Sequence, residues 1–295
     1  MSVGTYLKDE WLPAIRASVR PGTWDHYAKM LQAYVVPRIG ARRLGELQPN
    51  QLNRLYADLL VDGRRNGGPT RPAGLSPRTV RHVHTMLHKA FADAVRWGRI
   101  ARNPADRSEP PRPKTPEMKV WDIGHLRAFL SHVADDRLHA IWLLMVTTGM
   151  RRGEVLGLRW SDVDLEGARL SVVQTVVMVD RKIIVSEPKT ARRRRSIALD
   201  AATVAALRQL RRRQAEERLR YGELWKNAGL VTVHKDGSPI SPRLLSSWFT
   251  QHARAANLPR IRLHDVRHSY ATAARRRARP SGTSRAASRA GRRAR

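Results

Sequence analysis

Cysteine is absent from this 295-residue chain. That absence excludes disulfide bonds, thiol nucleophiles and thiolate metal sites. The chain also lacks any run of about eighteen apolar residues, so we expect it not to cross a membrane. Its N-terminus does not show the basic and then apolar pattern of a signal peptide, and we therefore expect it to reside in the cytoplasm.

Acidic residues are few for the number of basic ones. The sequence contains 56 lysines and arginines against 25 aspartates and glutamates, which gives a formal net charge of +31 at pH 7. So large an excess is typical of proteins that bind a polyanion, most often nucleic acid. The charge indicates the class of partner and leaves the activity open.

The first hundred residues show four stretches with helical periodicity, and residues 1–106 are predicted to form a small helical domain. We expect Thr23 to cap the second helix. The pair Ser76-Pro77 should start the fourth helix, because serine caps helices and proline fits the first turn. Basic residues on the outer face of each helix suit a domain that clamps DNA, although the same arginines also fit a solvated surface.

A proline-rich segment separates two domains. Four prolines lie within residues 107–118, and they favour an extended, semi-rigid linker. Residues 119–274 are predicted to form the second domain, and residues 275–295 a basic, disordered tail. The expected fold class is mainly α with a small antiparallel β-sheet, in the form of a helical domain followed by an α+β domain.

Within the second domain, an apolar run predicts a buried helix that ends at Gly149, where glycine frees the backbone for a sharp turn. The pattern then becomes extended. The β-branched stretch Leu170–Val179 predicts a strand, Asp180-Arg181 a turn, and residues 183–185 a partner strand. A third strand is predicted at residues 196–199. Further helix starts are expected at Asp122, Asp200 and Ser241.

Three polar motifs follow one another along this domain. Thr148-Gly149-Met150-Arg151-Arg152-Gly153-Glu154 places two arginines within one helical turn of a glutamate. Pro188-Lys189-Thr190 lies on the loop before the last strand, and in His264-Asp265-Val266-Arg267 the histidine and the arginine share a helix face. A guanidinium at the mouth of a buried helix is suited to clamping a phosphate with two hydrogen bonds. Taken singly, each motif also fits an ordinary surface contact.

Together these motifs resemble those of the tyrosine recombinases, the phage integrase family. The resemblance covers roughly Tyr6 to Ala274, and three motifs in order at fitting separations argue against a chance match. It implies a helical core-binding domain, a linker and most of a catalytic domain that exchanges DNA strands without a metal or other cofactor. It also implies double-stranded DNA as partner, self-association on DNA as a tetramer, accessory DNA-bending or directionality proteins, and a place in the bacterial cytoplasm or nucleoid.

The resemblance assigns a role to four residues. Arg151 and Arg267 would hold the two non-bridging oxygens of the scissile phosphate and neutralise the charge that gathers in the pentavalent transition state. Lys189 would protonate the leaving 5′ oxygen, and His264 would act as a general acid–base or hydrogen-bond donor.

The sequence departs from the family pattern after the third motif. The family continues with a Leu-Gly-His-type stretch and a nucleophilic tyrosine on a late helix, whereas here no histidine follows His268 and no tyrosine follows Tyr270. We expect Tyr270 to pack rather than attack, and strand cleavage to be absent from the chain as written. From Arg275 onward only Arg, Ala, Pro, Ser, Gly and Thr occur. A GC-rich gene read out of frame gives such a composition, so we expect a frameshift or a premature end, and a genuine basic tail is the alternative.

Three neighbouring residues have expected roles outside the chemistry. Glu154 is expected to orient Arg151, while Arg152 and His268 are expected to be structural or solvated. Two other functions stay open, a DNA-binding protein without catalysis and a general polyanion binder. The polyanion binder predicts no sequence preference, whereas the other two functions predict a preferred inverted-repeat site. Family members often carry an arm-type DNA-binding module ahead of the core-binding domain, and we expect this chain to lack it.

Overall fold

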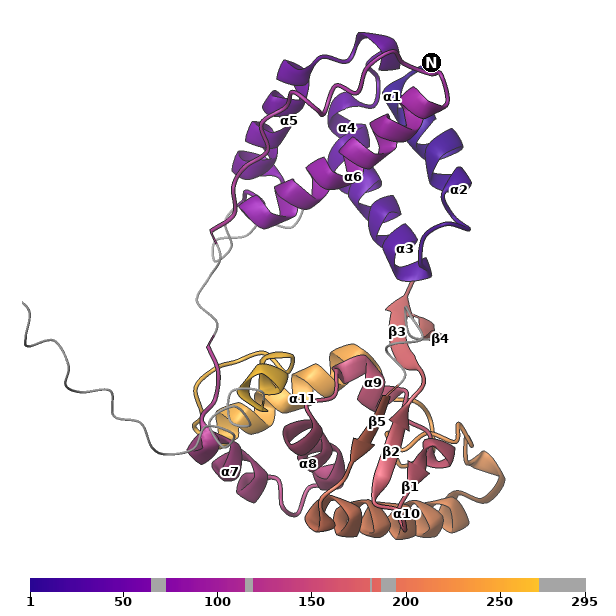
Figure 1. The fold of residues 1–295 in the computed structure, drawn as a ribbon, viewed down its shortest axis with the longest axis vertical. Coiled ribbons are helices and arrows are strands. Elements are labelled where there is room, and N and C mark those ends of the chain that lie inside the picture. Colours follow the sequence, from indigo (N-terminus) through magenta and orange to yellow (C-terminus); the bar gives the residue numbers. More distant parts are fainter. Residues whose placement is uncertain (65–72, 115–118, 181, 187–194, 271–295) are drawn as a thin grey trace, which may run out of the picture. The chain divides into compact units, whose positions relative to one another are not determined.

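A computed structural model describes residues 1–64, 73–114, 119–180, 182–186 and 195–270 of the chain (Figure 1). The chain divides into two compact units. One spans Met1–Glu117 with Val179–Lys182, and the other spans Met118–Met178 with Ile183–Arg295. Each unit has a hydrophobic core of its own. Within the described part of the chain, no helix combines the length and the apolarity that a bilayer crossing requires.

The first hundred residues, which make up most of the first unit, consist mainly of helices. The first helix and the second helix each pass through a short π-helical stretch, and the third and fourth helices are regular. In chain order they are α1 (Val3–Thr5), Tyr6–Trp11 and α2 (Leu12–Ala14), then α3 (Pro21–Met30), Leu31–Val35 and α4 (Val36–Ile39), then α5 (Pro49–Asp62) and α6 (Pro77–Arg96). A short 3-10 turn, Leu44–Glu46, precedes α5.

Proline and hydroxyl side chains set where these helices begin. The Oγ of Ser76 accepts a hydrogen bond from the N–H of Thr79 at 3.2 Å, and Pro77 opens α6 as predicted. The expectation that Thr23 caps the second helix is wrong, because α3 begins two residues earlier, at Pro21. Proline stabilises a first helical turn through its fixed φ, so α3 starts there without a capping side chain.

Buried polar contacts tie the first helix of this unit to α6. The hydroxyl of Tyr6 donates to the carbonyl of Ala90 at 2.7 Å, and the indole N–H of Trp11 donates to Asp93 at 2.9 Å. Within the predicted linker, the backbone N–H of Glu109 donates to Asn53 of α5 at 2.7 Å. The start of the proline-rich segment is therefore bonded to the helical unit.

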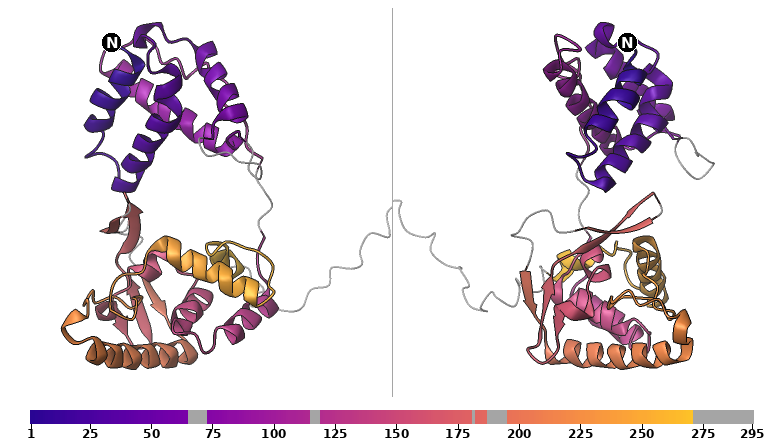
Figure 2. Two further views of the ribbon diagram at one scale, coloured as in Figure 1. Left: turned by 180° about the vertical axis from the view of Figure 1, so that it is seen from behind. Right: turned by 90° about the vertical axis from the view of Figure 1, so that its right-hand side faces the viewer.

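The second unit places helices around short strands (Figures 1 and 2). The helices are α7 (Ile123–His132), α8 (His139–Thr148), α9 (Arg152–Leu156), α10 (Ala201–Tyr221) and α11 (Pro242–Ala255), followed by a helical turn at residues 265–270. The strands are β1 (Val163–Asp164), β2 (Arg169–Val172), β3 (Thr175–Val179), β4 (Lys182–Ser186) and β5 (Arg195–Ala198).

The strands form two sheets instead of the single sheet that the sequence pattern predicts. β1, β2 and β5 make a three-stranded antiparallel sheet in that spatial order, and β3 pairs with β4. The predicted strand Leu170–Val179 is broken between β2 and β3, where the side-chain amide of Gln174 donates to the carbonyl of Gly157 at 2.7 Å. Asp180, with φ 46°, lies in the predicted turn between β3 and β4.

The helix α8 lies at the centre of the second core. Six of its ten residues are buried, namely Ala140, Ile141, Trp142, Leu144, Met145 and Val146. Buried residues on every side of a helix indicate that it is enclosed by other elements. In Figures 1 and 2, α7, α10 and α11 lie around it. The end of α8 is thereby fixed, and the first polar motif follows directly.

Candidate functional site

Gly149 forms the turn that carries the chain from the buried helix α8 to Arg151. It is left-handed, with φ 60° and ψ 27°, and its N–H donates to the carbonyl of Met145 at 3.2 Å. A left-handed residue that ends a helix is usually glycine, because a Cβ is strained in that conformation. Met150 is then buried, and Arg151 lies at the N-cap of α9. The start of the motif is therefore held by the core.

Glu154 fixes Arg151 from within the first turn of α9. Its carboxylate accepts the backbone N–H of Arg151 at 2.9 Å and the Nη1 of the same residue at 2.8 Å. The side chain of Glu154 is only 9% exposed, whereas that of Arg151 is 43% exposed. The predicted orienting contact between these two residues is thus present, and the guanidinium remains open to a ligand.

A second arginine binds the same carboxylate. Arg195, the first residue of β5, donates from Nη1 to Oε1 of Glu154 at 3.1 Å and from Nη2 to Oε2 at 2.7 Å. Burial alone would raise the pKa of the Glu154 carboxyl, but the hydrogen bonds from Arg195 and Arg151 outweigh it and hold this pKa at about 2. Glu154 is therefore ionised at neutral pH. Arg195 was not among the residues predicted for the site, and it lies one residue before the predicted strand 196–199.

Arg267 reaches the same turn from the far end of the chain. Its Nη1 donates to the carbonyl of Gly149 at 2.6 Å. Burial and the nearby charge of Arg151 lower the pKa of the Arg267 guanidinium. The helical turn that carries Arg267 begins at Asp265, which accepts the backbone N–H of Arg262 at 2.9 Å and its Nη2 at 2.7 Å. Arg151 and Arg267 thus converge from positions 116 residues apart in the sequence.

His264 lies beside the two arginines. Burial lowers the pKa of its imidazole, and so do the neighbouring His268, Arg267 and Arg151, while Asp265 acts in the opposite direction. The rings of His264 and His268 meet edge to face, with their centroids 5.6 Å apart. At neutral pH the His264 ring is therefore uncharged, with one N–H donor and one acceptor nitrogen.

The other predicted residues have different surroundings. Lys189 lies outside the described residues. Arg152 donates from Nη1 to the Oγ of Ser246 on α11 at 2.7 Å, which makes it a link between α9 and α11. Tyr270 packs against the turn, since a Cβ built on Gly149 would lie 2.7 Å from Cδ1 of its ring.

The cluster has the electrostatics of an anion site. Arg151, Arg195 and Arg267 contribute three positive charges and Glu154 one negative charge, so the described cluster carries +2 when His264 is neutral. Guanidinium groups that are oriented and partly desolvated bind phosphate oxygens in bidentate geometry. Among the described residues, no group of three or more His, Asp or Glu side chains is arranged to hold a metal ion.

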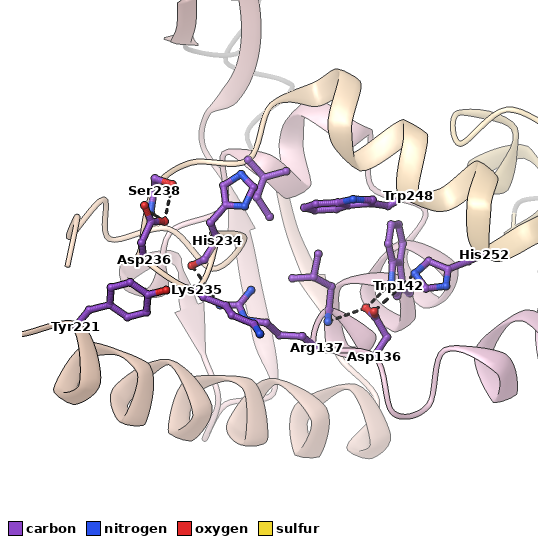
Figure 3. A pocket seen from close by; sticks show the side chains of 12 residues that line it. Asp136, Arg137, Trp142, Tyr221, His234, Lys235, Asp236, Ser238, Trp248 and His252 are labelled. Atoms are coloured by element: carbon purple, nitrogen blue, oxygen red, sulfur yellow. Dashed lines mark hydrogen bonds and ion pairs between the residues drawn. The ribbon is translucent and has the colours of Figure 1, made fainter. Parts of the chain in front are cut away.

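A separate cavity in the same unit has a different character (Figure 3). It encloses about 770 Å³ between the end of α10, residues 234–240 and α11. Its central cation, Arg137, is engaged by Glu217 at 2.6 Å and by the carbonyl of Val233 at 2.7 Å. One of its carboxylates, Asp136, accepts the indole N–H of Trp142 at 3.0 Å. Arg137 and Asp136 are thus engaged with other groups of the protein.

Two protein families match this chain, one in each of its two units. Residues 123–279 match the phage integrase family, and residues 5–60 match the N-terminal SAM-like domain of phage integrases. A XerC-like tyrosine recombinase of Caldanaerobacter subterraneus is 27% identical over 286 residues, which cover 90% of this chain and 70% of that protein. The ICEBs1 integrase of Bacillus subtilis is 28% identical over 199 residues, which cover 67% of this chain and 54% of that protein. The chain thus spans 54% to 70% of the length of these two relatives.

Solved structures show the same fold. The Tn1549 transposon integrase, in complex with transposon right end DNA, aligns with a TM-score of 0.76 over 94% of this chain and 87% of its own, at 18% identity. The lambda integrase, as a dimer bound to a COC′ core site, aligns with a TM-score of 0.64 over 94% of this chain and 88% of its own, at 14% identity. With its family match over more than half of its length, the chain belongs to the phage integrase family of tyrosine recombinases.

Proposed function

We propose that this chain is the DNA-binding and phosphate-activating part of a site-specific recombinase from a mobile genetic element. Arg151 and Arg267 hold the two non-bridging oxygens of the scissile phosphate and stabilise the negative charge of the transition state. The observation that carries this proposal is the convergence of both arginines on one turn, with Arg267 bonded to the carbonyl of Gly149 and Arg151 bonded to Glu154.

The remaining roles concern protons. His264, neutral at physiological pH, donates a hydrogen bond to the phosphate or accepts a proton from the attacking group. Lys189, which follows β4 and precedes β5 in the sequence, protonates the leaving 5′ oxygen. Neither role needs a metal ion or an organic cofactor. The chemistry instead depends on fixed charges around the phosphorus.

The whole chain is suited to a DNA duplex. Its net charge of +31 favours any polyanion, and the helical unit of residues 1–106 supplies basic helix faces for the phosphate backbone. The lambda integrase has been solved as a dimer on a core site and as a tetramer on a Holliday junction. We extend this to the present chain as self-association on DNA in the bacterial cytoplasm or nucleoid, with accessory bending or directionality proteins.

The runner-up function is a DNA-binding protein that occupies its site without breaking a strand. Both functions predict an inverted-repeat duplex when a random library is selected against the 295-residue chain, whereas a general polyanion binder enriches no sequence. The selected duplex then separates the two. Hydrogen peroxide is added at a pH where some hydroperoxide anion is present, so that this anion attacks the phosphorus and the bond to the 5′ oxygen breaks.

A recombinase site should give a single nick with a free 5′ hydroxyl at a defined position in each half-site. A chelator in the buffer suppresses radical cleavage, and Arg267→Ala serves as the variant in which the nick should disappear. Selected binding without any peroxide-dependent nick would support the non-catalytic DNA-binding protein. Selection of no sequence at all would contradict both functions.

A further inference from the structure

Among the described residues, the buried carboxylate of Glu154 has two arginine partners, and one of them lies outside the arginine motif. Arg151 contributes one side-chain bond of 2.8 Å and one backbone bond of 2.9 Å. Arg195 contributes two side-chain bonds, of 3.1 and 2.7 Å, one to each carboxylate oxygen. This is the paired, fork-like geometry in which an arginine binds a carboxylate most strongly. Arg195, on strand β5, therefore makes the stronger side-chain contact with Glu154.

The two arginines differ in which of their nitrogens bind Glu154 and in how exposed their side chains are. Both terminal nitrogens of Arg195 are directed at Glu154, and its side chain is 30% exposed. Among the described residues, Arg151 is bonded through Nη1 alone, and its side chain is 43% exposed. Arg151 thus keeps a whole terminal nitrogen for a ligand, whereas each terminal nitrogen of Arg195 donates one of its two N–H groups to Glu154. Arg195 is also the less exposed of the two.

Charge explains why a second arginine is needed. A carboxylate that orients Arg151 also cancels its charge, which would leave Arg267 as the one uncompensated arginine of this described cluster. A phosphodiester carries one negative charge and its pentavalent transition state carries two. With Arg195 present, the cluster carries +2 and matches that transition state. The charge of Arg195 also acts on Arg267, where it contributes to the lowered pKa.

We propose that Arg195 is a positioning residue of the phosphate site, which grips Glu154 so that this carboxylate orients Arg151 without cancelling the positive charge the scissile phosphate requires. This role rests on the proposed recombinase function. It assigns Arg195 no contact with DNA and no proton transfer. Its consequence is that losing Arg195 harms the site more when Glu154 is charged than when Glu154 is neutral.

The first test measures the ion pair without any DNA. The pKa of Glu154 is about 2 in the folded chain against an ordinary value of 4.5, so its contribution to stability is present above pH 4.5 and is lost as the pH falls toward 2. In Arg195→Gln the burial of Glu154 is opposed by fewer hydrogen bonds, so the pKa of this carboxyl rises. The loss of stability should still begin near pH 4.5, but it should be smaller and should end at a higher pH. Urea unfolding between pH 3 and 7 measures the size of this loss.

Arg195→Gln, Arg195→Lys and the double variant Glu154→Gln/Arg195→Gln are compared in that series. Arg159→Gln is the matched control, since Arg159 also forks onto a carboxylate, that of Asp162 at 2.8 and 2.9 Å. The double variant should show no acid loss of stability from this position, because the titrating group is gone. An unchanged pH profile in Arg195→Gln would overturn the proposal, because Glu154 would then not depend on Arg195.

The second test uses peroxide-dependent nicking of the selected duplex. Arg195→Gln should lower the nicking rate by about 10- to 100-fold, as the loss of a supporting partner typically does. The double variant has the cluster charge of the unmodified chain and should recover about tenfold of that loss. The nicking rate of Arg195→Lys should lie between those of Arg195→Gln and the double variant. Lysine keeps the positive charge but cannot make the two-pronged contact with the Glu154 carboxylate. Arg159→Gln should nick at the unmodified rate.

Two outcomes of this test would overturn the role of Arg195. Nicking by Arg195→Gln at the unmodified rate would be one, and a double variant no faster than Arg195→Gln would be the other. Failure of the proposed function looks different, because the unmodified chain would then not nick the duplex at all. In that case the role of Arg195 in the reaction falls as well, while the urea series still reports whether the ion pair exists.

Discussion

Replacing Gly149 with alanine tests the turn on which the phosphate site is built. Gly149 has φ 60°, and a Cβ at this position would lie 2.7 Å from Cδ1 of Tyr270. Its carbonyl also accepts the 2.6 Å bond from Arg267. Alanine therefore introduces backbone strain and a steric overlap at the point where Arg267 is held.

The expected loss of unfolding free energy is the sum of a backbone-strain contribution and a steric-overlap contribution. A left-handed backbone costs a residue with a Cβ about 1–2 kcal/mol. Tyr270 is 36% exposed and its ring can swing outward, so the overlap should add about 1 kcal/mol, at the low end for overpacking. The expected loss of unfolding free energy in Gly149→Ala is therefore about 2–3 kcal/mol. Gly229 has φ 64° with nothing within 4 Å of its Cβ, so Gly229→Ala should lose about 1–2 kcal/mol.

Urea unfolding followed by tryptophan fluorescence measures both variants, in the unmodified chain and in a Tyr270→Ala background. Removing the ring of Tyr270 should bring the loss in Gly149→Ala down to that in Gly229→Ala, because only the backbone strain remains. Gly149→Ala should also reduce peroxide-dependent nicking, since the carbonyl that holds Arg267 shifts. Equal losses for the two glycine variants in both backgrounds would refute the packing of Tyr270 on this turn.

Four further outcomes are expected. Duplex affinity, measured by fluorescence anisotropy, should fall by about 10³-fold or more between 50 and 200 mM salt, and an unchanged affinity would contradict backbone binding. Arg151→Ala and Arg267→Ala should each lower nicking by about 10²-fold or more with a much smaller loss of binding, whereas Arg152→Ala, which loses a bond to α11, should nick nearly as the unmodified chain does. The imidazole of His264 should titrate below its ordinary pKa in NMR spectra, and its midpoint should rise in Arg267→Ala because a neighbouring cation is removed. Incubated with duplex, the 295-residue chain should form no detergent-resistant adduct, and an adduct that Tyr270→Phe abolishes would show that Tyr270 attacks after all.

Helix starts could be predicted well from the sequence, because capping is a local interaction. Ser76, Asp122, Asp200 and Ser241 all accept an N–H of the helix that follows them, as expected. Thr23 could not be ranked against Pro21 from the pattern alone, since both residues favour a helix start. The prediction of one continuous strand, Leu170–Val179, was wrong because β-propensity does not reveal which strand each half pairs with.

The site was predictable where its contacts are local. Arg151 and Glu154 are three residues apart, so helical spacing placed them within one turn of each other, and the family resemblance indicated Arg151 as the residue that Glu154 orients. Arg195 reaches Glu154 across 41 residues, and its place is set by the register of β5 on β2, in which it lies opposite Val172. Strand register depends on the packed sheet, so a run of arginines in the sequence does not show which of them is directed at the carboxylate.

The first polar motif organises the site through its acceptors as much as through its arginine. The carboxylate of Glu154 receives Arg195 from the sheet, and the carbonyl of Gly149 receives Arg267 from the last described helical turn. Both acceptors are fixed by the buried helix α8 and the first turn of α9. Three guanidinium groups repel one another, so a cluster of them persists only where such acceptors compensate the repulsion. The turn after α8 therefore brings together arginines from three separate segments. Any change to the backbone of this turn should alter the positions of all three guanidinium groups.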